Sequence, residues 1–150
     1  MESMTQLVAA VLVHDLDTDR VVLLRRAPGA SFGRGLWDLP VGKCAPGEPI
    51  TATAARELKE ETGLLVDPAD LGLVHVLHGA AGVSADHGFL TVVFRAHRWR
   101  GTLRNAEPHK HSEARWFAKD ALPDDLVFGD ERVIHRCLTG EVGLTLRGWP

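Results

Sequence analysis

Three glutamates at positions 57, 60 and 61 have the spacing that places side chains on one face of a helix. They stand at i, i+3 and i+4, and at about 100° per residue these positions form one narrow stripe. Like charges in such a stripe repel one another unless a cation lies among them. Carboxylate oxygens are good ligands for Mg²⁺ and Mn²⁺, so the stripe is a candidate site for a divalent cation at a solvent-facing cleft. On spacing alone, three solvated glutamates on an exposed helix face are the simpler explanation.

The glutamates belong to a longer string of residue types, GKCAPGEPITATAARELKEETGL, which runs from Gly42 to Leu64. This string fits the pattern G-x5-E-x7-R-E-U-x-E-E-x-G-U, where U is apolar, at every defined position. The matching residues are Gly42, Glu48, Arg56, Glu57, Leu58, Glu60, Glu61, Gly63 and Leu64. Because the whole string matches, a functional role outweighs the simpler explanation, and the chain resembles the Nudix hydrolase family.

The resemblance implies an enzyme that cleaves a nucleoside diphosphate linked to another moiety, by attack of water on a phosphorus of the pyrophosphate bridge. It implies that Glu57, Glu60 and Glu61 hold Mg²⁺, with Mn²⁺ as a second option, and that Glu57 and Glu61 are the catalytic residues. Glu57 is also a candidate general base. In the family Glu48 and Arg56 usually pair to hold the loop against the helix, so their role is expected to be structural, like that of Gly42 and Gly63.

The residue before the motif departs from the family pattern. Many members have a glycine at this position and use its backbone carbonyl on the metal, whereas this chain has Val41. We keep the Val41 carbonyl in the expected metal site. A β-branched residue adopts a positive φ only with difficulty, so the sequence leaves the local loop geometry open. Lys43 follows in the same loop and either contacts a phosphate or lies in solvent.

Further candidates for substrate binding precede the motif. Arg26 follows an apolar segment and leads into the loop PGASFGRG at residues 28–35, where the family often contacts the nucleotide. Trp37 either stacks on a base or fills the core under the motif loop, and the sequence leaves both open.

A loop glutamate outside the motif commonly completes the metal site in this family. Glu107 and Glu113 are the candidates here, and the sequence does not choose between them. His109 and His111 are spaced like metal ligands, but two histidines at i and i+2 in a polar loop usually face solvent. No zinc site is expected.

The apolar patterning predicts the elements that position these residues. Strands are expected at 7–13, 21–24, 73–77, 89–96 and 116–117, with a short extended piece at 37–41. Helices are expected at 49–62, with Pro49 at its start and Gly63 just past its end, and at 127–138. No βαβ repeat is present, so the fold class is α/β, a sandwich with a mixed β-sheet rather than a doubly wound one. This order is similar to the Nudix α/β/α sandwich.

Composition limits the other possibilities. Residues 1–150 are expected to form one domain, and 17 Lys+Arg against 20 Asp+Glu give a net charge of −3. This charge argues against nucleic acid or a membrane as the partner and leaves a small-molecule nucleotide. Cys44 and Cys137 lie far apart, and the N-terminus lacks a secretion signal, so a cytoplasmic location is expected. A homodimer is an expectation from the family resemblance alone.

The substrate is less defined than the reaction. The segment NAEPHK at 105–110 resembles the family branch that acts on nucleoside and deoxynucleoside triphosphates. The absence of tyrosine weakens a diadenosine-polyphosphate assignment, and ADP-ribose or a nucleotide sugar is the second choice. A nucleotide-sensing domain without hydrolytic activity is the alternative from another class, although the complete carboxylate set argues against it.

Overall fold

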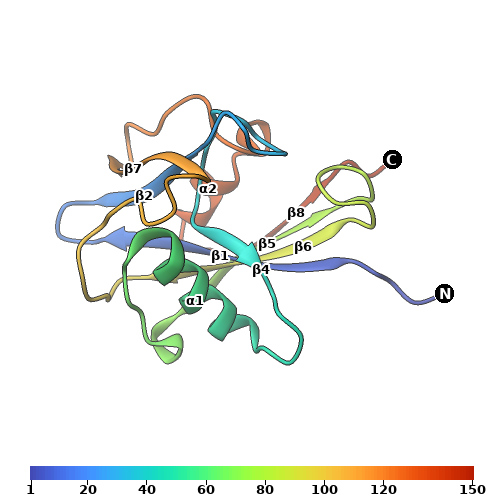
Figure 1. Ribbon diagram of the computed structural model, residues 1–150, viewed down its shortest axis with the longest axis horizontal. Helices are drawn as coiled ribbons and strands as arrows, with labels where there is room; N and C mark the ends of the chain where they lie inside the picture. The colour runs from blue at the N-terminus through green and yellow to red at the C-terminus, as the bar shows by residue number, and fades with distance from the viewer.

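A mixed sheet of eight strands forms the centre of the structure, a computed structural model that describes residues 1–150 (Figure 1). The hydrogen-bonded order is β3-β2-β1-β6-β5-β8, and β4 and β7 pair with β1 and β2. The pairs β1–β6 and β5–β8 are parallel, and the remaining pairs are antiparallel. The strands are β1 (Gln6–Asp15), β2 (Arg20–Arg26), β3 (Trp37–Asp38), β4 (Val41–Lys43), β5 (Gly72–Gly79), β6 (Phe89–Ala96), β7 (His111–Ala118) and β8 (Gly143–Arg147).

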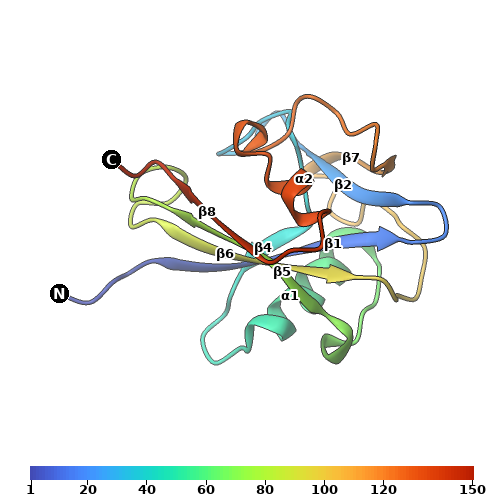
Figure 2. The same cartoon turned by 180° about the vertical axis from the view of Figure 1, so that it is seen from behind.

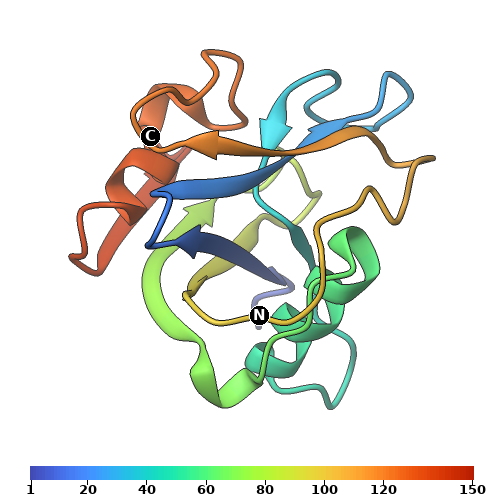
Figure 3. The same ribbon diagram turned by 90° about the vertical axis from the view of Figure 1, so that its left-hand side faces the viewer.

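Strand β1 is buried on both faces, which explains why its sequence is a continuous apolar run. Ala9, Val11 and Val13 belong to a core cluster with helix α1 (Ile50–Thr62). Ala10 and Leu12 belong to a second cluster that contains residues of helix α2 (Val133–Cys137). Figures 2 and 3 show the two helices on opposite sides of the sheet, so the predicted α/β/α sandwich is confirmed.

Helix α1 has the ends that the sequence predicts, within one residue. Pro49 has φ −61° and ψ 144° and stands just before the helix instead of being its first residue. Gly63 follows the last turn with φ 74°, and its N–H donates to the Lys59 carbonyl at 2.9 Å. A left-handed glycine at this point ends the helix without the steric cost that a side chain would add.

The predicted second helix at 127–138 is wrong in extent. The structure has a 3-10 turn, η2 (Gly129–Glu131), and then α2, which covers only the last part of the predicted span. Phe128 and Arg132 each have φ 53°, so the backbone is left-handed just before η2 and again before α2. A left-handed residue cannot continue an α-helix, and the two of them divide the segment.

The other elements extend or add to the prediction. Strand β7 begins at His111, well before the predicted Trp116, and β8 and the 3-10 turn η1 (Pro68–Asp70) were not predicted. In β8 the exposed side chains Leu144 and Leu146 are apolar while Thr145 is buried, the reverse of the usual alternation. No helix in the chain has the length and apolar character needed to cross a membrane.

Candidate active site

The carboxylate stripe of α1 is divided between a cavity and solvent. Glu57 and Glu61 line a cavity of about 630 Å³ that lies between α1, β4, the loop after β2 and the loop before β7. Glu60 is not part of the lining. Its side chain is 47% exposed and pairs with Arg56 at 3.3 Å. Two of the three predicted metal ligands therefore face the cavity, and the third lies on the outer surface of the helix.

Glu61 is buried, contrary to the expectation of carboxylates facing solvent. Its side chain is 5% exposed, its Oε1 accepts a hydrogen bond from the Val41 N–H at 2.8 Å, and its Oε2 lies 3.1 Å from His111 Nε2. Burial raises the pKa of Glu61, and the contact with His111 opposes that shift. The helix places this carboxylate where β4 and β7 meet the end of α1.

Glu57 lies directly against the backbone of Gly42. A Cβ atom at position 42 would be 2.0 Å from Glu57 Cδ, so only glycine leaves room for this side chain. Burial raises the pKa of Glu57, and the hydrogen bond from Arg56 Nη1 to Glu57 Oε1 at 2.8 Å opposes that shift. The first glycine of the motif, Gly42, therefore leaves the space that the Glu57 side chain occupies.

The pairing of Glu48 and Arg56 that the family resemblance implies is present. Arg56 donates from Nε to Glu48 Oε2 at 2.8 Å and from Nη2 to Glu48 Oε1 at 2.9 Å. Nη2 also donates to the Lys43 carbonyl at 3.1 Å. The Arg56 guanidinium, with smaller contributions from Thr53 and the Ala45 N–H, lowers the pKa of Glu48 to about 2. This arrangement ties the loop before α1 to the helix.

The structure answers the question about loop geometry that Val41 raised, because this residue adopts extended backbone. It lies in strand β4 opposite Ala10, and its φ is not positive. Hydrogen bonds link Val11 N–H to Pro40 O and Cys44 N–H to Leu7 O, both at 3.0 Å. Because bonded and non-bonded pairs alternate in an antiparallel ladder, the N–H and C=O of Val41 point away from β1. Extended backbone suits a β-branched residue.

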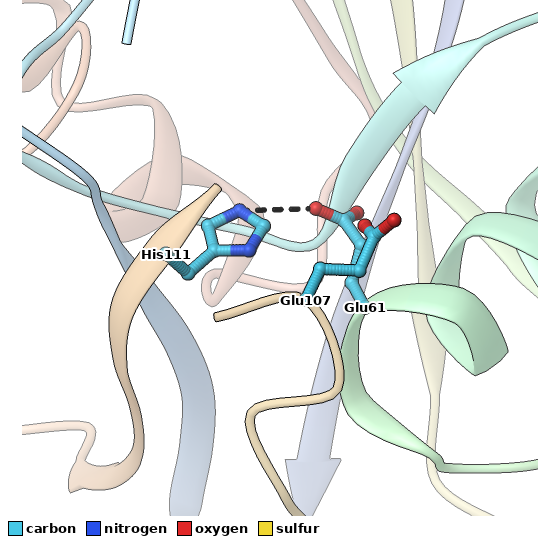
Figure 4. A group of neighbouring side chains, drawn as sticks. All are labelled: Glu61, Glu107 and His111. Carbon is cyan, nitrogen blue, oxygen red and sulfur yellow. Dashed lines mark ion pairs between the residues drawn. The ribbon is translucent and has the colours of Figure 1, made fainter. Parts of the chain in front are cut away.

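Glu107 and His111 join Glu61 beside the cavity (Figure 4). One ligand atom from each of the three side chains lies within 4.8 Å of the other two. His111 is 5% exposed, so the prediction that it faces solvent is wrong, because β7 begins at this residue and places the ring against Glu61. His109 is exposed as expected. Glu113 is not part of this group and pairs with Arg115 at 3.1 Å.

Three phenylalanines form an aromatic part of the cavity lining. They are Phe32, Phe89 and Phe128. The ring centroids are 5.6 Å apart in the pair Phe32–Phe128 and 5.7 Å apart in the pair Phe89–Phe128. No pattern in the sequence pointed to Phe89, because it reads as an ordinary apolar residue of a strand. The three side chains come from a loop, β6 and the segment before η2, so only the folded chain brings them together.

Trp37 belongs to the core, so its prediction as a substrate-binding residue is wrong. It is 3% exposed and packs edge-on against Phe117 at 4.8 Å between ring centroids. Asp38, the next residue of β3, lines the cavity instead. Removal of this carboxyl group from water raises its pKa to about 7. Sequence reasoning did not identify Asp38.

Positively charged side chains complete the lining. They are Arg26, Lys43 and Lys110. Arg26 and Lys43 are the two basic residues that the sequence predicted to bind substrate. Arg26 also donates from Nε to the Phe32 carbonyl, which fixes the loop that carries Phe32. The cavity thus combines buried carboxylates, cations and aromatic rings.

Comparison with known proteins identifies the family. The NUDIX domain family model matches residues 4–137. The chain belongs to the Nudix family. It is 32% identical over 130 residues to the 8-oxo-dGDP phosphatase NUDT18 of Mus musculus, a match that covers 85% of this chain and 36% of that protein. It is 32% identical to the oxidized purine nucleoside triphosphate hydrolase of Danio rerio, over 85% of this chain and 75% of that protein.

Solved structures agree with the Nudix assignment. The crystal structure of the MutT NUDIX hydrolase from Burkholderia pseudomallei superposes with a TM-score of 0.77 at 25% identity, over 89% of this chain and 98% of that one. The chain spans only about a third of the length of the mouse relative. The Nudix fold is therefore shown, and four residues of the Nudix box, Gly42, Lys43, Glu57 and Glu61, line the cavity described above.

Proposed function

We propose that this chain is a divalent-metal-dependent pyrophosphohydrolase that cleaves a nucleoside triphosphate to the monophosphate and pyrophosphate. The observation that carries the proposal is the cavity in which Glu57 and Glu61 of the Nudix box meet Lys43, Arg26 and an aromatic surface. Its volume of about 630 Å³ lies within the usual range for small-ligand sites, roughly 300–1,000 Å³. Each part of a nucleotide has a chemical counterpart in the lining.

The donor atoms around Glu57 suit a hard divalent cation. We assign Mg²⁺, with Mn²⁺ as the second option, to Glu57, Glu61 and the Val41 carbonyl, and Glu60 would join them only if its side chain turned from Arg56 toward the cavity. All of these donors are oxygens, as Mg²⁺ requires, and the register of β4 turns the Val41 carbonyl away from β1. A bound cation would neutralise phosphate oxygens and lower the pKa of a coordinated water.

The side chains of the cavity have distinct proposed roles. Lys43, Arg26 and Lys110 attract the phosphate groups, and Phe32 and Phe128 hold the base. Glu57 is the proposed general base. Its burial raises its pKa above the ordinary glutamate value, and a more basic carboxylate is better able to accept a proton from the attacking water.

The names of two relatives suggest which nucleotides to test first. The Danio rerio protein is named as a hydrolase of oxidized purine nucleoside triphosphates, and the mouse protein as a phosphatase of 8-oxo-dGDP. We therefore propose oxidised purine nucleotides as the leading substrate class. ADP-ribose or a nucleotide sugar is the second candidate, and a nucleotide sensor without hydrolysis is the third.

The test is product analysis over a substrate panel with Mg²⁺. The panel contains normal and oxidised purine triphosphates and diphosphates, ADP-ribose and a nucleotide sugar, and pyrophosphate is assayed separately from phosphate. The wild type is compared with Glu61→Gln and Glu57→Gln. The matched control is Glu113→Gln, which changes an exposed carboxylate that pairs with Arg115 and does not line the cavity.

We expect pyrophosphate release from an oxidised purine triphosphate, a loss of at least about a hundredfold in each of the two Nudix-box variants, and full activity in the control. Cleavage of ADP-ribose alone would replace the proposed substrate. Tight nucleotide binding with no product from any compound would overturn the enzymatic assignment in favour of a sensor.

A further inference from the structure

Strand β8 forms one edge of the sheet (Figure 2) and ends beside the aromatic part of the cavity lining. It follows residue 137, where the match to the family model ends, so the Nudix match does not account for this strand. Its last residue, Arg147, does not line the cavity. The guanidinium carbon of Arg147 instead lies over the ring of Phe128, 4.8 Å from the ring centroid. Arg147 therefore contacts a residue of the lining without belonging to the lining itself.

Phe128 has a backbone conformation that needs support from its surroundings. Its φ is 53°, a left-handed value that a bulky aromatic residue rarely adopts. A residue in such a conformation persists only where the neighbouring structure holds it there. On the N-terminal side, the Val127 N–H donates to the Trp37 carbonyl at 2.8 Å, which ties the chain to β3. A second support is needed on the C-terminal side, where the short turn η2 follows.

Arg147 supplies this second support. Its Nη1 forms an ion pair with Oε1 of Glu131, the last residue of η2. The two side chains are only 32% and 24% exposed, so solvent screens the pair less than it would screen a fully exposed one. A guanidinium group can donate hydrogen bonds from its edge while its plane lies on an aromatic ring. One side chain of β8 thus holds both η2 and the ring of Phe128.

Gly79 of β5 brings a second aromatic ring to the same place. It pairs with Phe89 of β6 on one side and with Arg147 of β8 on the other. A Cβ atom at position 79 would be 2.0 Å from Phe89 Cε1, so the Phe89 ring lies against the glycine backbone. The rings of Phe89 and Phe128 stack at 5.7 Å with 16° between their planes. The two strands that flank Gly79 therefore supply both the ring and the cation that contact Phe128.

We propose that Arg147 is a positioning residue that holds Phe128 in the cavity lining and thereby sets the affinity for the base of the nucleotide. The inference rests on the proposed function, which assigns Phe128 to the base. Arg147 does not line the cavity that contains the Nudix-box glutamates, so it acts on binding of the base and not on the chemical step. Loss of its guanidinium group frees η2 and lets Phe128 leave its left-handed conformation.

The first test needs no ligand. Amide hydrogen exchange is measured over residues 126–132 in the wild type and in Arg147→Gln, with the amides of α1 as an internal reference. We expect exchange in this segment to accelerate by about fivefold or more in Arg147→Gln, while exchange in α1 stays the same. Unchanged exchange in the segment, or an equal acceleration in α1, would overturn the proposal.

Arg115→Gln is the matched control for this variant. Arg115 also pairs with a glutamate, Glu113, at 3.1 Å, and its guanidinium carbon also lies over a phenylalanine ring, that of Phe117, at 4.6 Å. None of these three residues lines the cavity. Arg115→Gln therefore removes the same kinds of contact at another place, and we expect it to leave exchange in residues 126–132 unchanged.

The second test is a double-mutant cycle between Arg147 and Phe128. KM and kcat for the purine triphosphate that is cleaved best are compared in the wild type, Arg147→Gln, Phe128→Leu and the double variant. We expect Arg147→Gln to raise KM by about fivefold or more with kcat within about threefold, and to add nothing in the Phe128→Leu background. Hydrolysis of tripolyphosphate, which lacks a base, should be equal in the wild type and Arg147→Gln. Additive effects on KM, or a parallel loss on tripolyphosphate, would overturn the proposal.

Direct binding separates this proposal from the proposed function. Calorimetry with GMP and Mg²⁺ measures affinity for a purine nucleotide without hydrolysis. A protein that cleaves no nucleotide but binds GMP about fivefold more weakly after Arg147→Gln would support the role of Arg147 and overturn the enzyme assignment. Hydrolysis of a purine triphosphate with an unchanged KM in Arg147→Gln would leave the enzyme assignment intact and overturn the role of Arg147.

Discussion

At the scale of single residues, Glu61 connects the parts of the active site. Its carboxylate accepts the Val41 N–H of β4 and faces His111 of β7, while its backbone carbonyl accepts the Ala106 N–H. These contacts come from two segments, one at residue 41 and one at residues 106–111, that are distant in sequence from Glu61 and from each other. The Nudix box identified the glutamate, but only the fold supplies the partners that bury it.

Gly42→Ala is predicted to remove activity while leaving the protein folded. The added Cβ would lie 2.0 Å from Glu57 Cδ, and the atoms in conflict belong to a flexible side chain that can swing away. Position 42 has no positive φ, so alanine fits the backbone. We expect kcat to fall by at least about tenfold with a small change in Tm, because the catalytic carboxylate is displaced. Steady-state kinetics and thermal unfolding measure both.

The control for this prediction is Gly129→Ala. The nearest atom to a Cβ at position 129 is 3.5 Å away, an ordinary contact, and Gly129 does not line the cavity. Wild-type kinetics in Gly42→Ala would show that Glu57 can work from another position and that the glycine serves a different purpose.

Trp37 and Asp38 show what the sequence could and could not predict about the site. The sequence predicted a short extended piece at 37–41 before the motif, but it offered Trp37 as the candidate and passed over Asp38. Successive side chains of a strand point to opposite faces, so one residue separates the core from the cavity. The sequence cannot show which face is which until the neighbouring strands are in place. His111 was wrongly expected to face solvent for a related reason. The sequence suggested a polar loop, whereas His111 is the first residue of β7 and its ring faces Glu61.

At the scale of elements, helix α1 was predictable because the residues that mark its two ends and the residues of its motif are close together in the sequence. Pro49, Gly63 and the glutamate spacing all lie within one segment. The structure of segment 127–138 was not predictable in this way, because Phe128 and Arg132 adopt a left-handed backbone that neither residue type favours. Strand β8 escaped prediction because its apolar residues face outward. Local signals thus predicted the helix that carries the Nudix-box glutamates but not the segments at 127–138 and 143–147.

Gly63→Ala is predicted to destabilise the end of α1. Alanine at φ 74° carries a backbone cost of about 1–2 kcal/mol, and its Cβ would also lie 2.7 Å from Arg104 Nε. Gly63→Asn introduces the same Cβ, but asparagine tolerates left-handed backbone better. We expect the free energy of unfolding, measured with urea, to fall more for alanine than for asparagine. Equal losses would assign the effect to the Arg104 contact instead.

Glu48→Gln is predicted to change the pH dependence of stability. The pKa of Glu48 is lowered in the folded protein from 4.5 to about 2, mainly by Arg56. Its stabilising contribution is therefore complete above pH 4.5 and is lost as the pH falls toward 2. We expect the variant to be less stable than the wild type at pH 7 and 5, with the difference shrinking between pH 4.5 and 2. Urea unfolding at several pH values measures this difference.

A constant difference between the two proteins across that range would contradict the assignment of the low pKa to the Arg56 pair. Glu113→Gln serves as the comparison, because its ion pair with Arg115 is exposed to solvent and is expected to contribute little.

At the scale of the whole molecule, the cavity is built from segments along most of the chain. Phe32 follows β2, Phe89 opens β6, Lys110 precedes β7 and Phe128 comes from the segment before η2. Phe128 pairs with both other phenylalanines, and its backbone is left-handed. This long-range convergence is why the aromatic surface could not be predicted from sequence, whereas helix α1 with its glutamates could.

Phe128→Ala is predicted to weaken nucleotide binding without impairing the chemical step. Stacking of a base on an aromatic ring contributes roughly 1–3 kcal/mol, so we expect KM to rise by about tenfold or more while kcat changes by less than about threefold. Tripolyphosphate, which lacks a base, is the control substrate, and its hydrolysis should be equal in the two proteins. Phe128→Leu preserves apolar packing but lacks the ring, so it should show the same rise in KM with a smaller loss of stability. A parallel loss of activity on tripolyphosphate would instead show that Phe128 supports the carboxylate site through the fold.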